Sequence, residues 1–247
     1  MRYLKNPNLP ESEVTKAIVS SEMSRESEYA LNSLGIELVK IPKSDKLYDA
    51  IKSHPDIRLC HIGDNFIIAE PDIKAYLEQN LPNANICTGN KISESYPGDI
   101  AYNTAIMGEF VICNKAYTDN NILNYANSNG MTVIDVRQGY AKCNMAIIAK
   151  NAVITSDKGI FEALRFFLID VLLTEDNSIL LKNLNHGFLG GATGKIAPDK
   201  MLVNGNINYH KNKDEIIKFA SKYDVEIISL NKGQIEDIGS ILPILEK

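Results

Sequence analysis

Short apolar runs with β-strand character and helical patterns follow one another along this chain in an order that repeats. In the clearest copy, residues 101–108 and 110–114 are two such runs. Residues 119–130 then have apolar side chains at helical spacing and end at Gly130, and residues 131–136 form an apolar strand. This copy predicts a ββαβ unit, in which a helix separates the second strand from the third.

Three further segments show the same order. Their predicted elements are strands 57–63, 66–70 and 85–89 with helix 72–79; strands 143–151, 152–157 and 171–175 with helix 159–167; and strands 187–194, 200–205 and 225–230 with helix 214–223. An ordinary α/β sandwich is the alternative, but it has one strand for each helix, whereas these segments mostly have three. Four complete units are therefore predicted.

The two ends of the chain together supply a fifth unit. A strand at 16–21, a helix at 24–34 and a strand at 36–41 lack one strand, and residues 239–246 supply it. Joining the ends in this way removes two exposed sheet edges. We therefore predict an α/β fold in which residues 1–247 form a single domain. That domain is a five-bladed propeller of ββαβ units around a central channel, closed by the C-terminal strand in the N-terminal unit.

Composition and charge limit the classes of function. Of the 247 residues, 45% are hydrophobic, enough for a substantial core, and the formal net charge is −5 with mixed signs along the chain. A nucleic-acid-binding protein would carry a clustered basic face instead. The first residues lack the apolar core of a signal peptide, and no run approaches the roughly 18 apolar residues of a membrane span. We expect a cytoplasmic protein that binds neither nucleic acid nor membrane.

Four cysteines lie in strand-like segments without close pairing, which argues against a disulfide framework. We expect Cys60, Cys87 and Cys113 to be buried, unreactive thiols, because free cysteine is among the most buried residue types. Cys143 stands at the start of a unit with Arg137 and Lys142 nearby, and either cation could stabilise the thiolate that attacks carbon. A half-buried structural thiol is the alternative for Cys143.

A second segment of interest, residues 185–195, is rich in glycine. It fails as a phosphate-binding loop, because Leu189 stands where that motif has glycine and Ile196 where it has serine or threonine. A tight bend or bulge that lines the channel is the favoured interpretation. His186 precedes the bend and is a candidate general acid or base, unless it is an exposed histidine without a role. His54 lies in what reads as a solvent-exposed turn and is discounted.

Small or polar residues recur where the first strand of each unit is expected to meet the channel. They are Asp64, Asn103, Asn144, Gly191, Thr193 and Ser240. An all-apolar set would fill the channel, whereas this set predicts that it binds a small polar molecule. Asp64 and Asp237 are the candidate partners for a positive charge on that molecule.

The order of the units and their closure resemble the pentein fold, which is shared by guanidino-group-modifying enzymes: arginine and agmatine deiminases, dimethylarginine hydrolases and amidinotransferases. The segments QGYAKC (138–143), ITSDKGI (154–160), HGFLGGATG (186–194) and IGSILPI (238–244) are similar to an uncharacterised bacterial family of that fold. The resemblance implies that a cysteine attacks a guanidinium carbon, a histidine transfers protons and carboxylates hold the cationic substrate.

The chain departs from those enzymes at the positions that carry their chemistry. They have the cysteine in the closing strand, where this chain has Ser240, and their His-x-Asp motif is absent at His186. One hypothesis moves the chemistry to another unit, with Cys143 as nucleophile, His186 as proton carrier and Asp157 or Asp64 as cation partner.

Two other hypotheses follow from the same departure. The ring either binds a small molecule without reacting with it, or is an interaction protein, as a ribosome anti-association factor of this fold is. We favour a cysteine-dependent hydrolase or transferase, deiminase-like or amidinotransferase-like, that acts on a guanidine, amidine or amide compound. The expected partner is a small polar, cationic molecule, and the sequence indicates neither a metal ion nor an organic cofactor.

Overall fold

Four sheets of one construction account for the middle of the chain in the computed structural model, which describes residues 1–175 and 178–247. In each, the first two strands are antiparallel, a helix follows the second strand, and the third strand is parallel to the second. The units are β4 (Leu59–Gly63), β5 (Phe66–Ala69), α3 (Pro71–Asn80) and β6 (Asn85–Thr88); β7 (Ala105–Met107), β8 (Phe110–Cys113), α4 (Asn120–Ser128) and β9 (Thr132–Asp135); β10 (Ala146–Ala149), β11 (Ala152–Thr155), α6 (Lys158–Arg165) and β12 (Asp170–Leu173); and β13 (Thr193–Ala197), β14 (Lys200–Val203), α7 (Lys213–Ser221) and β15 (Glu226–Ser229). These are the four units that the sequence predicts.

The fifth sheet unites the two ends of the chain. Its strands, in order, are β1 (Arg2–Tyr3), β16 (Leu242–Glu246), β2 (Val14–Ser20) and β3 (Glu37–Ile41), with α1 (Arg25–Ser33) between β2 and β3. Because β16 is antiparallel to β2, and β2 is parallel to β3, β16 takes the place of a first strand. The predicted pairing of the C-terminal strand with the N-terminal unit is present.

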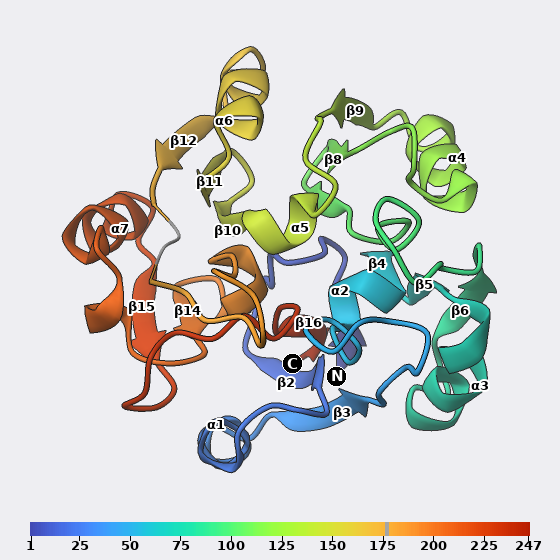
Figure 1. Cartoon of the computed structure of the whole chain (residues 1–247), viewed down its shortest axis with the longest axis horizontal. Helices are drawn as coiled ribbons and strands as arrows, with labels where there is room; N and C mark the ends of the chain where they lie inside the picture. Colours follow the sequence, from blue (N-terminus) through green and yellow to red (C-terminus); the bar gives the residue numbers. More distant parts are fainter. Residues whose placement is uncertain (176–177) are drawn as a thin grey trace.

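The five sheets lie around a common centre, with α1, α3, α4, α6 and α7 at the periphery and both chain ends near the middle (Figure 1). Each peripheral helix packs between the sheet of its own unit and the sheet of the preceding unit. Ile73 of α3 shares an apolar cluster with Ile18 and Val39 of the fifth sheet. Leu31 of α1 shares one with Leu202 of β14, which links the last unit to the first. In the described part of the chain, the apolar core therefore lies between neighbouring units.

Local sequence explains where the helices begin. Ser24 and Asp119 accept hydrogen bonds from backbone N–H groups in the first turns of α1 and α4, and Asp157 does the same for α6. Pro71 opens α3, at a position where its missing N–H costs nothing. Within residues 1–175 and 178–247, no helix has both the length and the apolar character needed to cross a membrane.

All five first strands begin later in the chain than the sequence predicts, and in three of the units a short helical turn stands before the strand. A short helix, α2 (Pro55–Arg58), precedes β4; another, α5 (Ala141–Asn144), precedes β10; and a 3₁₀ turn, η1 (Gly190–Ala192), precedes β13. A first strand can begin only opposite a residue of its antiparallel partner. The partners β11 and β14 are short, so β10 and β13 cannot extend further toward their N-termini. The unpaired residues turn toward the centre instead.

Candidate active site

The polar cluster at the centre is built from the segments that come just before the five first strands. Asp56 lies on α2, Cys143 on α5 and Gly190 on η1, whereas Asn103 and Ser240 precede β7 and β16 directly. The Asn103 side chain donates to the Asp56 carbonyl at 3.3 Å, and the Ser240 hydroxyl is 3.0 Å from the Gly190 carbonyl. All five units therefore contribute one residue to a single buried cluster.

The thiol of Cys143 is the centre of this cluster. Its Sγ lies 3.1 Å from both carboxylate oxygens of Asp56, and the Asn103 amide donates to it at 3.2 Å. Only 2% of Cys143 is exposed. Burial and the nearby carboxylates of Asp56 and Asp237 raise the pKa of this thiol well above its usual range. The structure therefore holds a protonated thiol that donates to Asp56.

Lys142 reaches the cluster through Ser240, and the charges of Asp56 and of a Cys143 thiolate favour its protonated form. Its ammonium group donates to the Ser240 hydroxyl at 2.8 Å, and that hydroxyl is 2.7 Å from the second Asp56 oxygen. Burial lowers the pKa of Lys142. Ser240 has a φ of 76° and connects the lysine to the carboxylate.

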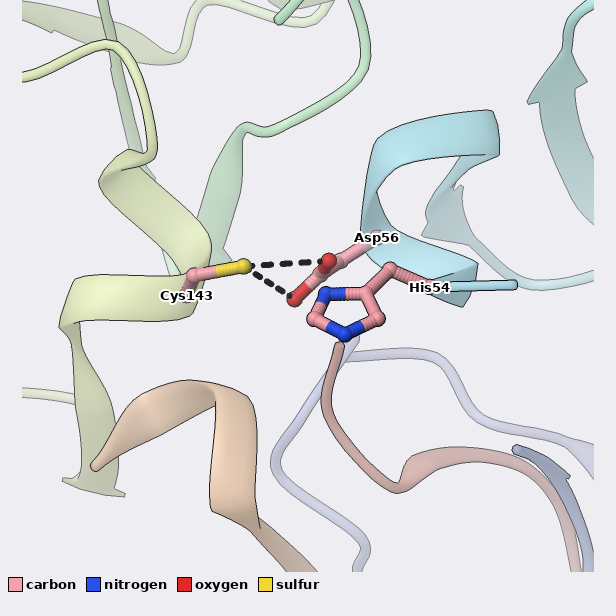
Figure 2. A group of neighbouring side chains, drawn as sticks. All are labelled: His54, Asp56 and Cys143. Atoms are coloured by element: carbon pink, nitrogen blue, oxygen red, sulfur yellow. Dashed lines mark hydrogen bonds between the residues drawn. The ribbon is translucent and has the colours of Figure 1, made fainter. Parts of the chain in front are cut away.

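His54 and Asp237 form the other side of the cluster. Figure 2 shows the His54 ring beside the Asp56 carboxylate, with Cys143 opposite. His54 is buried, so its interpretation as a solvent-exposed turn is wrong, and burial lowers its pKa to about 4. Asp237 accepts backbone N–H groups from Phe188 and Gly239 at 3.0 Å each. Burial and the charge of Asp56 raise the pKa of Asp237 to about 7.

Two glycines allow this close packing. A Cβ atom at Gly191 would lie 2.0 Å from an Asp237 oxygen, and one at Gly239 would lie 2.3 Å from the His54 Cβ. Gly239 also has a φ of 74°, which side chains with a Cβ rarely adopt. The glycine-rich segment is therefore a tight bend against the site, as its sequence indicates.

A cavity of about 130 Å³ opens onto the thiol. Its lining residues are Tyr48, Ile51, His54, Tyr140, Cys143, Leu181, Leu184, His186, Phe188 and Asp237. The walls are mostly apolar and aromatic, whereas Cys143, His54 and Asp237 supply the buried polar groups. A second cavity, of about 190 Å³, shares His54 and Asp237 and is also lined by Glu22 and Glu236. The site therefore lies between two spaces that can admit a small molecule.

The structure brings together some of the candidate residues and separates others. Cys143, Asn103, Gly191 and Ser240 meet at the centre, and His186 is an exposed residue of the same cavity, packed edge-on to the Phe188 ring.

The remaining candidates lie outside this cluster. Asp64 is exposed in the β4–β5 turn, and only its carbonyl contacts His61. Asp157 is the N-cap of α6, where it accepts from Ile160 at 2.8 Å. The Asn144 side chain accepts from backbone N–H groups in the same turn, at 3.3 Å from Asp157. Thr193 begins β13 and bonds within its own segment, to Gly190.

Sequence reasoning missed Asp56, His54 and the position of Lys142. A signal was available, since Asp56 precedes the first strand of its unit as Asn103 and Ser240 precede theirs. Asp64, the residue that the sequence favours, follows the other end of that strand. The expectation that Cys87 is buried is also wrong, because Cys87 lies exposed on β6, the third strand of its sheet.

Comparison with known proteins places the fold. The profile of DUF6873, a family of unknown function, matches residues 18–242. No curated protein matches the sequence. Among solved structures, the inosamine-phosphate amidinotransferase from Streptomyces griseus is 12% identical with a TM-score of 0.58, over 100% of this chain and 98% of that chain. The agmatine deiminase of C. jejuni is 11% identical with a TM-score of 0.56, over 94% and 91%.

A third similar structure is the dimethylarginine dimethylaminohydrolase from Pseudomonas aeruginosa, which is 7% identical. Its TM-score is 0.58, over 94% of this chain and 100% of that chain. At these identities the likeness concerns the fold alone. This chain shares the pentein fold of these three proteins.

Proposed function

The chain belongs to the DUF6873 family, and from its pentein fold and its central site we propose that it is a cysteine-dependent hydrolase or transferase. The proposed substrate is a small guanidine, amidine or amide compound, and the proposed nucleophile is Cys143. The observation that carries the proposal is the Cys143 thiol, 3.1 Å from the Asp56 carboxylate, lining a cavity of about 130 Å³.

The acidic groups around the thiol favour a cationic substrate. Asp56 and Asp237 are both buried, and their charges oppose ionisation of Cys143. A guanidinium or amidinium group bound between them would neutralise those charges and so lower the thiol pKa. The nucleophile would then form only when substrate is present. Agmatine and dimethylarginine, which are named in two of the similar structures, are guanidino compounds, and the third is named for transfer of an amidino group. These names support the same substrate class.

The chemistry uses groups that are already in contact. Asp56 takes the thiol proton while Cys143 Sγ attacks the central carbon of the substrate, forming a tetrahedral centre. The C–N bond to the leaving amine breaks as the amine takes that proton. Water, in a hydrolase, or a second amine, in a transferase, then displaces Sγ from the carbon. His186 and His54, which line the cavity, are the candidate proton carriers for this second step.

The proposal assigns the substrate's positive charge to Asp56 and Asp237 rather than to Asp64 or Asp157, which lie outside the cavity. We also propose that the five units form a five-bladed α/β propeller. The packing of each helix on the preceding unit, from α3 around to α1, supports that arrangement.

A second candidate function is binding without turnover. Lys142 donates to Ser240 beside Asp56, so a cationic group already stands next to one of the carboxylates that a substrate would need. In this case the cavity holds a ligand and Cys143 is not used as a nucleophile.

The test is release of ammonia or amine from a panel of guanidines, amidines and amides. The panel is assayed with the unaltered chain, Cys143→Ser and Cys87→Ser, the last being a control at an exposed thiol. We expect Cys143→Ser to abolish turnover and Cys87→Ser to retain it. Turnover that survives in Cys143→Ser would overturn the proposal. Tight binding of panel compounds, with no turnover of any, would establish the second candidate in its place.

A further inference from the structure

His54, Asp56 and Cys143 together have the composition of a metal site. One ligand atom from each, an imidazole nitrogen, a carboxylate oxygen and Sγ, lie within 4.8 Å of one another, and all three residues are buried (Figure 2). His54 Nδ1 is buried without a hydrogen-bond partner among the described residues. It lies 3.8 Å from an Asp237 carboxylate oxygen, beyond hydrogen-bond distance, and 5% of the His54 side chain is exposed. A buried nitrogen without a hydrogen bond is costly, and a bound metal ion would satisfy it.

From this geometry we infer that the chain binds one Zn²⁺ ion through His54, Asp56 and Cys143. Zinc prefers nitrogen and sulfur ligands together with carboxylate oxygen, at about 2.0 to 2.3 Å, which puts neighbouring ligand atoms about 3.5 Å apart. Cys143 Sγ and the Asp56 oxygens are already 3.1 Å apart. The imidazole nitrogen lies within 4.8 Å of both atoms and has to approach them to complete the set.

Charge and access both favour this ion. On binding, Sγ forms a bond to Zn²⁺ and its proton leaves to solvent, so a thiolate and a carboxylate neutralise the dication. Hard cations such as Mg²⁺ prefer all-oxygen sites and are disfavoured by the sulfur and nitrogen ligands. His54 and Cys143 both line the cavity of about 130 Å³, which leaves a fourth coordination position open to a water molecule.

Zinc binding does not depend on the proposed reaction, but it bears on it. A thiolate held by zinc cannot attack carbon, so the metal and a cysteine-directed substrate would exclude each other. Zn²⁺ would then switch off cysteine chemistry at this site.

The test measures binding without turnover. The chelator-treated full chain is titrated with Zn²⁺ against a chromophoric chelator and, separately, with Co²⁺ as a spectroscopic substitute. We expect one ion per chain, a Kd of about 1 μM or tighter, and a thiolate-to-cobalt charge-transfer band. Cys143→Ser should lose that band, and His54→Asn should weaken binding at least about tenfold. Cys87→Ser, at an exposed residue outside the cavity, should bind as the unaltered chain does.

A second measurement needs no variant. Zn²⁺ should protect Cys143, but not Cys87, from alkylation in the unaltered chain, as read by peptide mass spectrometry. Absence of binding, binding without a thiolate band, or affinity unchanged in folded Cys143→Ser would overturn the site. None of these results would affect the proposed cysteine reaction, which is measured by turnover.

Discussion

Burial changes the ionisation of every titratable side chain in the central cluster for which a shift is resolved. It raises the pKa of Cys143 and Asp237 and lowers the pKa of Lys142 and His54. Each shift favours the uncharged form, because a low-dielectric interior penalises charge. A cation bound beside Cys143 and Asp237 would lower their pKa values again and so favour their ionised forms.

Asp237 should make the protein less stable as pH rises. Its pKa is about 7 in the folded chain and 3.8 ordinarily, so the folded state keeps a proton that the unfolded state loses between those values. The stability that Asp237 contributes is complete below about pH 4 and is lost as pH rises through 7. Asp237→Asn has no carboxyl group at this position, so its stability does not fall with pH for this reason. The free energy of unfolding of Asp237→Asn minus that of the unaltered chain should therefore increase by a few kcal/mol from pH 4 to pH 8.

Urea unfolding of both proteins at several pH values checks this, with Asp45→Asn as the control at an exposed carboxylate. Curves for the unaltered chain and Asp237→Asn that stay parallel across this range would contradict the pKa shift.

Gly191 should not tolerate even a methyl group. The Cβ of Gly191→Ala would lie 2.0 Å from an Asp237 oxygen, so either the carboxylate or the backbone has to move. We expect a loss of about 1 to 3 kcal/mol in the free energy of unfolding. Gly233→Ala, in an exposed turn where the nearest atom belongs to the Asn231 side chain, should change stability by less than about 0.5 kcal/mol. Equal effects at the two positions would show that the bend is not packed as described.

At the scale of elements, the short helix α2 is the part of the site that depends most on its support. It has four residues and contributes Asp56, and its last residue, Arg58, is buried against the Glu70 carboxylate. Arg58 also donates to the Pro42 carbonyl at 2.6 Å. A helix this short has little stability of its own, so these contacts hold Asp56 in position.

Glu70→Gln should therefore destabilise the chain strongly. It leaves the Arg58 guanidinium buried without a counter-charge, which typically costs about 3 to 5 kcal/mol. The matched change at a surface pair, Glu175→Gln beside Lys211, should cost less than about 1 kcal/mol, because both side chains are more than half exposed. Chemical denaturation compares the two. A cost for Glu70→Gln no larger than that for Glu175→Gln would mean that α2 is held by other contacts.

The sequence predicted the elements well because their signals are local. Apolar runs and helical spacing located the three main strands and the peripheral helix of each unit, and the missing strand of the first unit pointed to residues 239–246. The two-residue strand β1 was not predicted. The site was harder to predict. His54 is buried because Gly239 packs against it from the far end of the chain, and nothing in the local sequence indicates that contact. Asp56 was missed because the start of its strand was placed too early, which hid the turn that carries it.

At the scale of the whole molecule, closure depends on β16. Leu242 and Ile244 of that strand lie in the apolar cluster between the first two units. The Glu246 carboxylate is buried and accepts hydrogen bonds from Arg2 and from the backbone of Glu11 and Ser12. The two ends of the chain are therefore held together by pairing, core packing and a buried charge.

A circular permutant should consequently fold. Arg2 pairs with Glu246 across the sheet, so a short linker can join Lys247 to Met1, with new ends opened in the exposed turn between Ala116 and Tyr117. We expect one cooperative thermal transition within about 2 kcal/mol of the natural order. Deletion of residues 242–247 should instead abolish cooperative unfolding. A permutant that fails to fold, or a deletion that folds normally, would contradict closure by β16.

The central claim is that Cys143 is a nucleophile in a site built for a cation, and alkylation tests it most directly. The rates of chloroacetamidine, which is cationic, and chloroacetamide, which is neutral, are measured at each cysteine by peptide mass spectrometry. Exposed Cys87 gives the intrinsic ratio of the two reagents. At Cys143 the ratio should exceed that value by about tenfold or more, since the cation neutralises the carboxylates that keep the thiol protonated. A ratio equal to that of Cys87, or a Cys143 inert to both reagents, would contradict the account.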